Sequence, residues 1–300
     1  MKKTILILTS DPFSANYEII KKTFFFFKNR NKNNNYLFVG DRNDFENYAG
    51  SEASFLKFVD VKKNLNTGLY LQNCFEKAFE ILKNKKAHGL INLPLNKKFL
   101  PKKHPGFTEY ISSYFGTGGM ETMLMYNEIF SVCPNTTHIP LRLVSRNLSK
   151  KIIKKNITNI YNFYKNILGL KKPNIAIMGF NPHNGMDFGN SYEEDKIIKP
   201  VIKEIKKSKI KILGPLSPDS AFNEIQSKKI NCLIGNYHDQ VLPTFKYINK
   251  FKAINITLGL PFLRVSPDHG PALEIKGKNI ANPDSFLYAL NFFEKHYKKI

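Results

Sequence analysis

The sequence predicts an α/β fold built on a largely parallel sheet, and three observations support that prediction. Short apolar runs alternate with longer segments whose apolar residues follow helical spacing. Each short run ends in a segment that carries Gly or Pro, as at Gly40 and Pro94. The chain shows no repeat of fixed period and no coiled-coil pattern. Strands, loops and helices in regular succession are typical of units that place parallel strands in one sheet.

The chain before residue 100 is predicted to hold three strands and two helices. Ile5–Leu8 is a short apolar run followed at once by a polar turn, which is typical of a buried strand. Glu18–Phe27 is apolar enough for a helix, and Cys74–Leu82 has its apolar residues at helical spacing. Tyr36–Val39 and Gly89–Leu93 are the remaining strands, because each is a brief apolar run closed by Gly or Pro.

The rest of the chain continues the alternation. Lys150–Leu168 is predicted as a helix, and Gly169 suits the residue after its last turn. The β-branched run Asn174–Met178 is predicted as a strand and Glu193–Lys207 as a helix. Three further short strands are predicted at Lys211–Leu213, Cys232–Ile234 and Ala253–Leu258.

Length and composition exclude several classes of protein. At 300 residues and 34.6 kDa, the chain forms one large domain or two modest ones, and its 42% hydrophobic residues exclude disorder as the main state. No stretch reaches the roughly 18 apolar residues of a spanning helix, so we predict no membrane partner. The apolar start is too short for a signal peptide, which needs about 7–15 such residues. The three cysteines are widely spaced, which predicts a reduced, cytoplasmic protein.

The charge invites a nucleic-acid interpretation, which the composition argues against. There are 46 basic and 24 acidic residues, a net charge of +22. Only five of the basic residues are Arg, the side chain favoured for bidentate contacts to bases and phosphates. The others are Lys, mixed with Asn, Ile and Phe, and these four types share A/T-rich codons. We therefore predict no nucleic-acid partner, and that alternative rests on charge alone.

Three of the seven histidines occupy turn-rich segments that follow apolar segments. They are His138, His183 and His238. Neutral imidazole is the commonest metal ligand in proteins, and three of them with an open position are typical of a catalytic divalent site. The three lie 45 and 55 residues apart, so spacing alone leaves three unrelated histidines as an alternative. Asp239 can orient the His238 ring or serve only as a turn residue.

A second set of residues is cationic or polar near the ends of predicted strands. It consists of Lys246, Asn255 and Arg264. An Arg in a chain so rich in Lys suggests a planar carboxylate or phosphate partner, although a structural salt bridge is the alternative. The segment from Ser266 to Ala272 contains His269 and fits either a plain loop or a ligand-binding loop.

Seven short runs carry a more specific signal. They are Gly-Phe-Thr-Glu (106–109), Thr-Thr-His-Ile-Pro-Leu (136–141), Asn-Pro-His-Asn-Gly (181–185), Tyr-His-Asp-Gln (237–240), Leu-Pro-Thr-Phe-Lys (242–246), Asn-Ile-Thr-Leu-Gly-Leu-Pro-Phe (255–262) and Ser-Pro-Asp-His-Gly (266–270). In this order and spacing, from about residue 85 to the end, the chain resembles the 4-hydroxythreonine-4-phosphate dehydrogenase family of the vitamin B6 pathway.

The resemblance implies two α/β/α domains with a cleft between them, as in isocitrate and isopropylmalate dehydrogenases. Residues 1–300 then form one catalytic unit of two subdomains, whose internal boundary is not readable from the sequence. It also implies a homodimer with a shared active site. The family's metal ligands correspond to His138, His183 and His238. Its substrate-binding residues correspond to Thr108, Lys246, Asn255 and Arg264.

The implied activity is oxidation of the secondary alcohol of 4-phosphooxy-threonine with NAD or NADP. The product is a β-keto acid that decarboxylates to 3-amino-2-oxopropyl phosphate, in pyridoxal 5'-phosphate biosynthesis. One divalent metal ion per subunit is implied, Zn²⁺ or alternatively Mg²⁺ or Co²⁺, while Lys246 and Arg264 would hold phosphate and carboxylate groups. No G-x-G-x-x-G follows any predicted strand, which agrees with the implied fold.

The chain departs from the family pattern at two places. The family carries Gly-His-Thr-Glu where this chain has Phe107 as the second residue, and Phe cannot form the hydrogen bond of that His. The family's glycine-rich N-terminal turn has no glycines here, although Asp11, Pro12 and Glu18 remain. Two alternatives therefore stay open: a dehydrogenase of a related phosphorylated sugar acid, and a metal-binding paralogue with weakened catalysis.

Overall fold

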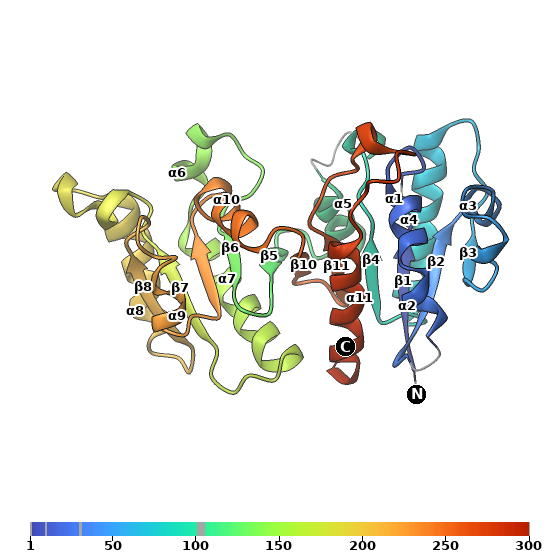
Figure 1. Ribbon diagram of the computed structural model, residues 1–300. Helices are drawn as coiled ribbons and strands as arrows, with labels where there is room; N and C mark the ends of the chain where they lie inside the picture. The colour runs from blue at the N-terminus through green and yellow to red at the C-terminus, as the bar shows by residue number, and fades with distance from the viewer. Residues whose placement is uncertain (1, 10, 30–31, 101–105, 300) are drawn as a thin grey trace. The chain divides into compact units, whose positions relative to one another are not determined.

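The predicted strands form the sheets of two separate units (Figure 1). The structure is a computed structural model that describes residues 2–9, 11–29, 32–100 and 106–299. Unit 1 combines Met1–Glu121 with Phe251–Ile300, and unit 2 is the segment Thr122–Lys250. The chain leaves unit 1 through a short turn at residues 115–121 and returns through another at residues 250–253. Both connections are short, so no long linker marks the boundary in the sequence.

In the described residues, unit 1 has a six-stranded sheet in the order β3-β2-β1-β4-β11-β10. The strands are β1 (Lys3–Leu8), β2 (Asn34–Gly40), β3 (Phe58–Asp60), β4 (Gly89–Asn92), β10 (Ile254–Leu258) and β11 (Leu263–Pro267). Strand β1 pairs in parallel with β2 and β4, β4 with β11, and β2 with β3, whereas β10 and β11 are antiparallel. All four residues of β4 are buried, as expected for a strand covered on both faces.

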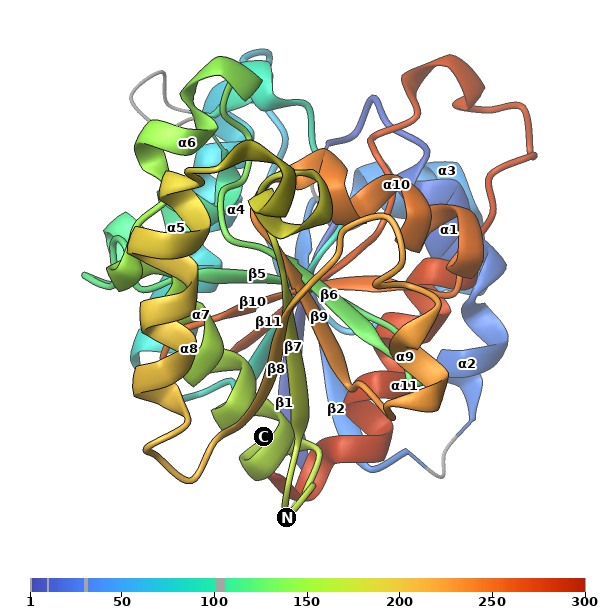
Figure 2. The ribbon, with the colours of Figure 1, turned by 90° about the vertical axis from the view of Figure 1, so that its left-hand side faces the viewer.

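Helices cover both faces of this sheet. They are α1 (Asn16–Lys22), α2 (Phe24–Lys28), α3 (Arg42–Ala49), α4 (Thr67–Lys83), α5 (Phe107–Tyr114) and α11 (Asp284–His296). Helix α4 packs on β1 and β2, and α11 packs on β10 and β11. Figure 2 shows α4 and α11 on opposite sides of the strands. Unit 1 is therefore a three-layer α/β/α sandwich.

Unit 2 repeats this architecture with a five-stranded sheet in the order β5-β6-β9-β7-β8, counted over the described residues. The strands are β5 (Thr122–Tyr126), β6 (Ser131–Pro134), β7 (Asn174–Met178), β8 (Lys211–Leu216) and β9 (Cys232–Gly235). Strand β9 pairs in parallel with β6 and with β7, and β7 in parallel with β8. Strands β5 and β6 form the antiparallel pair of this unit.

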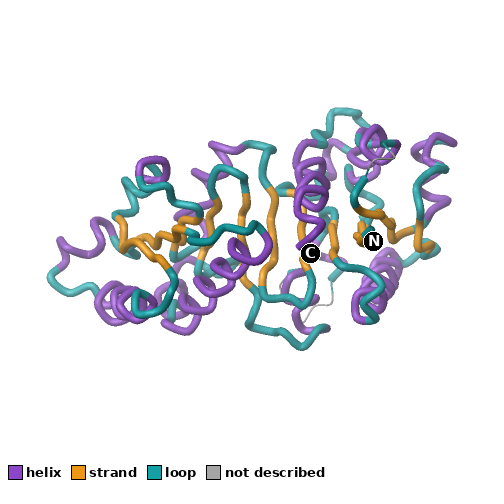
Figure 3. Tube along the Cα trace, turned by 90° about the horizontal axis from the view of Figure 1, so that it is seen from below, coloured by secondary structure: helices purple, strands orange, loops and turns teal. Residues whose placement is uncertain are grey.

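The helices of unit 2 also lie on two faces. They are α6 (Val144–Asn147), α7 (Lys150–Asn162), α8 (Lys199–Ile205), α9 (Glu224–Ser227) and α10 (His238–Asn249), with π-helical turns at Phe163–Ile167 and Glu193–Ile198. Helix α7 packs on β5 and α8 on β8, whereas α10 packs on β6 and β9. Figure 2 places α7 and α8 on one side of these strands and α10 on the other, and Figure 3 shows strands between helices in each unit.

The predicted α/β class with a largely parallel sheet is confirmed, and the predicted strand Asn174–Met178 has the predicted bounds. Gly169 adopts a positive φ of 76° directly after the predicted helix, as a C-terminal glycine should. The predicted helix Glu18–Phe27 is wrong as one element, because Thr23 separates α1 from α2. The hydroxyl of Thr23 donates to the carbonyl of Ile20 at 2.7 Å, a local bond that competes with helix continuation.

Several elements were not predicted from the sequence. The sequence analysis placed Lys246 and Arg264 near strand ends, but Lys246 lies inside helix α10 and Arg264 inside strand β11, and neither element was predicted. Pro243 lies inside α10, where proline is disfavoured, so the sequence pattern argued for a break. In the structure, Val241, Leu242 and Phe245 are buried at helical spacing, and their packing outweighs the proline. No helix in the described part of the chain is long and apolar enough to cross a membrane.

Candidate active site

The three predicted metal ligands follow three neighbouring strands of unit 2. His138 lies four residues after the end of β6, His238 three residues after β9, and His183 five residues after β7. Strand β9 pairs in parallel with β6 on one side and with β7 on the other. All three histidines therefore lie beyond the carboxyl edge of one sheet, the edge at which open α/β sheets bind ligands.

A buried asparagine, Asn236, connects the ends of these strands. Its side-chain amide donates to the carbonyl of Met178 at the end of β7, at 3.1 Å. Its own carbonyl accepts from the hydroxyl of Thr136, which follows β6, at 2.8 Å. Gln240 of α10 accepts from the Asn236 N–H at 2.7 Å and donates to the carbonyl of Gly179 at 2.9 Å. These bonds fix where each histidine-bearing segment leaves the sheet.

The segment that carries His183 has an unusual backbone. His183, Asn184 and Gly185 have φ angles of 48°, 58° and 71°. This left-handed region costs residues with a Cβ about 1–3 kcal/mol each, so such residues persist only where surrounding contacts hold them. A Cβ at position 185 would collide with the side chain of Ser191, so this turn requires glycine there.

The buried carboxylate of Glu194 supplies the contacts that hold this turn. Its Oε1 accepts from the backbone N–H groups of Phe180 and Asn181, both at 2.7 Å. Its Oε2 accepts from the Asn181 side chain at 2.9 Å and from the Ser191 hydroxyl. Burial alone would raise the pKa of Glu194, but the hydrogen bonds outweigh it and lower that pKa. A charged Glu194 therefore organises the segment that presents His183.

Carboxylates flank two of the imidazole rings. Nδ1 of His183 lies 2.6 Å from an oxygen of Asp187, and Nδ1 of His238 lies 2.6 Å from an oxygen of Asp239. The hydrogen bond with Asp187 is the main cause that raises the pKa of His183, and Asp219 lies 3.9 Å from its Nε2. Carboxylates on Nδ1 orient the rings and assign Nε2 to a ligand, as in many metal-binding histidines.

The donor set suits a divalent cation, and the structure brings two of its three members together. The ring centroids of His138 and His238 are 5.6 Å apart. Among the described residues, however, no three His, Cys, Asp or Glu side chains lie close enough together to hold a metal ion. His183 thus shares the sheet edge with the other two without joining them in one ligand group. Imidazole rings with a carboxylate on Nδ1, as at His183 and His238, have the donor chemistry that Zn²⁺ favours.

Lys246 belongs to the same unit as the three histidines. It lies eight residues after His238 on α10, which places it about two helical turns further along, and it is exposed. A lysine there offers a flexible point charge to an anion rather than a fixed planar contact.

Unit 1 buries the guanidinium of Arg264, which is 4% exposed. Nε donates to the side-chain oxygen of Asn92 at 2.6 Å. Nη1 donates to the hydroxyls of Thr257 at 2.6 Å and Thr108 at 3.2 Å. All three acceptors are neutral, and Arg264 forms no ion pair with a described carboxylate. Among the described residues, Arg264 is therefore held by hydrogen bonds to neutral oxygens. The structural salt bridge that the sequence analysis gave as an alternative is not formed there.

Two other predicted substrate residues lie in unit 1. Thr108 is the second residue of α5, so its contact with Arg264 brings two predicted residues together. Asn255 lies on β10, opposite Ser266 of β11. The side-chain oxygen of Asn255 is buried and has no hydrogen-bond partner in the part of the chain that the structure describes. An unpaired buried acceptor costs about 1–3 kcal/mol, so a bound donor would stabilise it.

Phe107, where the chain departs from the family pattern, belongs to the apolar core of unit 1. Its ring centroid lies 5.0 Å from that of Phe75 and 6.2 Å from that of Phe79, both on α4. The guanidinium carbon of Arg264 lies 5.5 Å from the same ring. Burial lowers the pKa of Arg264 to about 10, while the charge of Glu109 acts in the opposite direction. The guanidinium is therefore charged at neutral pH, with an aromatic ring beside it.

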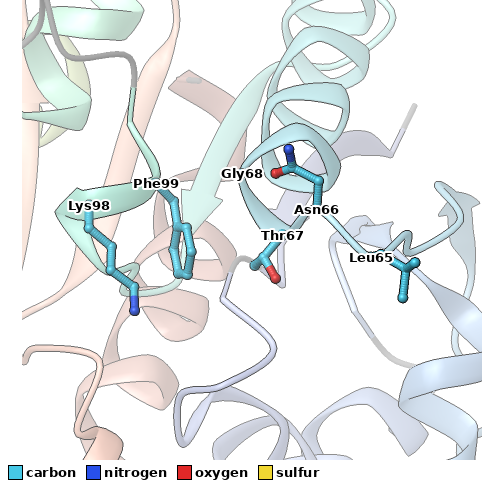
Figure 4. A pocket seen from close by; sticks show the side chains of 6 residues that line it. All are labelled: Leu65, Asn66, Thr67, Gly68, Lys98 and Phe99. Carbon is cyan, nitrogen blue, oxygen red and sulfur yellow. The ribbon is translucent and has the colours of Figure 1, made fainter.

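A surface hollow of about 630 Å³ lies elsewhere in unit 1, at the start of α4 (Figure 4). It is lined by Leu65, Asn66, Thr67, Gly68, Lys98 and Phe99. None of the predicted site residues belongs to this lining. The side-chain oxygen of Asn66 is already used to cap α4, since it accepts from the N–H of Leu69 at 3.1 Å. The predicted site residues therefore lie outside this hollow.

Four polar residues of the site were not predicted from the sequence. They are Asn92, Asn236, Thr257 and Glu194. A polar residue at the end of an apolar strand is a usable signal for Asn92 and Asn236. Thr257 looks like any β-branched strand residue, and Glu194 like any glutamate of a charged helix. Their roles depend on contacts with residues that are distant in the sequence.

Comparison with solved structures identifies the fold class of the chain. Its fold is similar to that of the solved isocitrate dehydrogenase from Methylococcus capsulatus, with a TM-score of 0.53 and 10% identity over 98% of this chain and 85% of that one. A 4-hydroxythreonine-4-phosphate dehydrogenase structure from Klebsiella pneumoniae matches more closely. Its TM-score is 0.84, at 24% identity over 100% of this chain and 99% of that one. The predicted isocitrate dehydrogenase-like α/β/α fold is confirmed.

Sequence comparison gives the family. The family model for "Pyridoxal phosphate biosynthetic protein PdxA" matches residues 19–293. A curated relative from Sulfurihydrogenibium sp. (strain YO3AOP1), named 4-hydroxythreonine-4-phosphate dehydrogenase, is 34% identical over 95% of this chain and 96% of its own length. The chain belongs to the PdxA family of pyridoxal phosphate biosynthetic proteins. The predicted family resemblance is thereby confirmed.

Proposed function

We propose that this chain is an NAD- or NADP-dependent, metal-assisted 4-hydroxythreonine-4-phosphate dehydrogenase. The secondary alcohol of 4-phosphooxy-threonine loses a hydride to the cofactor and a proton to solvent, and becomes a ketone. The resulting β-keto acid loses carbon dioxide and gives 3-amino-2-oxopropyl phosphate. A relative that carries this enzyme's name and matches 95% of the chain supports the reaction.

The observation that carries this proposal is the buried Arg264, charged and held only by neutral oxygens. Burying a guanidinium without a carboxylate partner carries a large desolvation cost, which a bound anion would offset. The proposed substrate has a carboxylate and a phosphate, and either group fits an arginine. The Thr108 hydroxyl and the unpaired Asn255 oxygen supply polar contacts from the same unit. The family resemblance also implies Lys246 as a substrate-binding residue, and its positive charge suits an anionic group.

The three histidines are proposed to hold one divalent cation per subunit, Zn²⁺ or alternatively Mg²⁺ or Co²⁺. Such a cation supplies Lewis acidity that lowers the pKa of a substrate hydroxyl. Asp187 and Asp239 fix the rings of His183 and His238 so that Nε2 can act as a ligand. A nicotinamide cofactor supplies the hydride acceptor, and the absence of G-x-G-x-x-G from the sequence argues for binding unlike the usual Rossmann turn.

The wider setting follows the family resemblance. We propose a homodimer with a shared active site, located in the cytoplasm and acting on a small phosphorylated substrate. No nucleic-acid partner is proposed, because the positive charge consists of dispersed Lys rather than of Arg.

A second candidate function is the same oxidation on a related phosphorylated sugar acid. Phe107 favours it, because a ring inside an apolar cluster contributes no hydrogen bond to the substrate that a family His would bind. A metal-binding paralogue with weakened catalysis is the remaining alternative, and it predicts metal binding without turnover.

Absorbance of the reduced cofactor tests these functions on a panel of phosphorylated hydroxy acids, each with and without a chelator. We expect chelator-sensitive reduction of NAD or NADP with 4-phosphooxy-threonine. Turnover of only a sugar-acid phosphate would support the second candidate. No turnover of any member, with metal still bound, would support the paralogue.

A further inference from the structure

Arg264 lies in the middle of three paired strands, and each neighbouring strand contributes one oxygen to its guanidinium. Arg264 of β11 pairs with Thr257 of β10 and with Leu90 of β4. Asn92 follows Leu90 by two residues, so its side chain lies on the same face of the sheet as that of Leu90. Both acceptor oxygens are therefore placed by the register of a buried sheet and not by a loop.

The hydrogen bonds use two of the three guanidinium nitrogens. Nε is bound to Asn92 and Nη1 to Thr257, both at 2.6 Å, and Thr108 adds a longer contact to Nη1. Asn92 and Thr257 are 4% and 2% exposed, so neither side chain has room to reorient. For Nη2 we find no hydrogen-bond partner among the described residues. Two nitrogens are held and the third, Nη2, is left for a ligand.

The chemical nature of the residues that bind Arg264 is as informative as their position. An arginine buried only for stability is normally paired with a carboxylate, because a carboxylate offsets most of the desolvation cost. An amide oxygen and two hydroxyls align the guanidinium without neutralising it. The full positive charge is thus kept for a group that is not part of the chain.

We infer that Asn92 and Thr257 are positioning residues that hold Arg264 through neutral oxygens, so that its Nη2 group meets an anionic oxygen of the substrate. This inference rests on the proposed function for the identity of the substrate. The alignment of the Arg264 guanidinium by neutral oxygens depends only on residues of unit 1.

Two substitutions separate positioning from a merely structural role. Asn92→Asp keeps an oxygen on Nε but adds a negative charge, so the fold should be at least as stable while anion binding weakens about tenfold, because a nearby carboxylate competes for the guanidinium. Thr257→Val removes the hydroxyl at nearly constant volume and should weaken anion binding by a similar factor. Thr257→Ser restores the hydroxyl and should restore binding. Thr23→Val, a buried threonine of the same unit away from Arg264, is the matched control.

The full-length protein with ¹⁵N-labelled arginine is suitable for this test, because the chain has only five Arg. The Arg264 side-chain signal is assigned by its loss in Arg264→Lys. Inorganic phosphate is titrated in one arm and acetate in the other, which separates a phosphate from a carboxylate partner. We expect at least one anion to move the Arg264 signal in wild type, and the dissociation constant to rise about tenfold in Asn92→Asp and Thr257→Val.

The inference is overturned if neither anion moves the Arg264 signal, or if the dissociation constant is unchanged in both variants. Should Thr257→Val fail to fold, Asn92→Asp and its unfolding temperature decide alone. The proposed function fails in a different way: wild type would bind an anion at Arg264 and yet reduce no cofactor with 4-phosphooxy-threonine.

Discussion

The guanidinium carbon of Arg264 lies 5.5 Å from the ring centroid of Phe107. The contact joins the position at which this chain departs from the family pattern to a residue that we propose binds the substrate. It also explains how a Phe is tolerated there, since a cation beside an aromatic ring gains about 0.5–2 kcal/mol. The same ring packs on Phe75, so position 107 belongs to the core and to the edge of the candidate site at once.

Phe107→His should therefore cost stability, because it removes apolar contacts with Phe75 and Phe79 and buries a polar ring. We expect about 1–3 kcal/mol less free energy of unfolding, measured by urea denaturation. On 4-phosphooxy-threonine, kcat/KM should improve or stay near that of wild type, because the new ring adds a hydrogen-bonding group beside Arg264. Lower kcat/KM on this substrate, together with a wild type that prefers a sugar-acid phosphate, would show a pocket rebuilt for another acid.

Arg264→Lys keeps the charge but loses the planar group that Asn92 and Thr257 hold. A lysine cannot bond to both oxygens in the same geometry, so we expect KM to rise about tenfold or more. Steady-state kinetics on the best substrate of the panel measures this. Arg42→Lys is the matched control, since Arg42 forms a surface ion pair with Glu46. Wild-type kinetics in Arg264→Lys would reduce Arg264 to a packing residue.

Replacement of His138, His183 or His238 by Ala should lower metal affinity at least about tenfold, since even losses outside the ligand shell cost 10–100-fold. Isothermal titration of the metal-free protein with Zn²⁺ measures the affinity and the number of ions, which should be about one per subunit. His88→Ala is the control, because His88 is exposed in unit 1. Unchanged metal content in all three variants would mean that these histidines are not the ligands.

Glu194→Gln should destabilise unit 2 and do so in a pH-dependent way. The folded-state pKa of Glu194 is lowered, so its charged form stabilises the fold above the ordinary pKa of 4.5, and this contribution is lost as the pH falls through the lower, folded-state pKa. At pH 7 we expect about 1–3 kcal/mol lower free energy of unfolding for Glu194→Gln. The gap to wild type should shrink below about pH 4.5, measured on metal-free protein. A gap that is constant down to pH 3 would contradict this role.

Much of the fold was predictable because it depends on local pattern. The apolar runs Ile5–Leu8 and Asn174–Met178 are strands whose residues are all buried, as expected for a sheet covered on both faces. The three histidines were identified by their position after such runs, and strand pairing places all of them beyond one sheet edge. Strand β11 and helix α10 were missed, because a Pro and scattered polar residues disrupt the local pattern there.

The sequence by itself determined the class of fold, the family and the residue types available for chemistry. Only the tertiary structure decided how they are used: that Arg264 is held by Asn92 and Thr257, that Glu194 braces the turn before His183, and that Phe107 lies in the core. The reason is physical. Strand formation depends on residues that are neighbours in the chain, whereas the partners of a buried charge are 172 residues apart for Arg264 and Asn92, and only the register of the sheet brings them together.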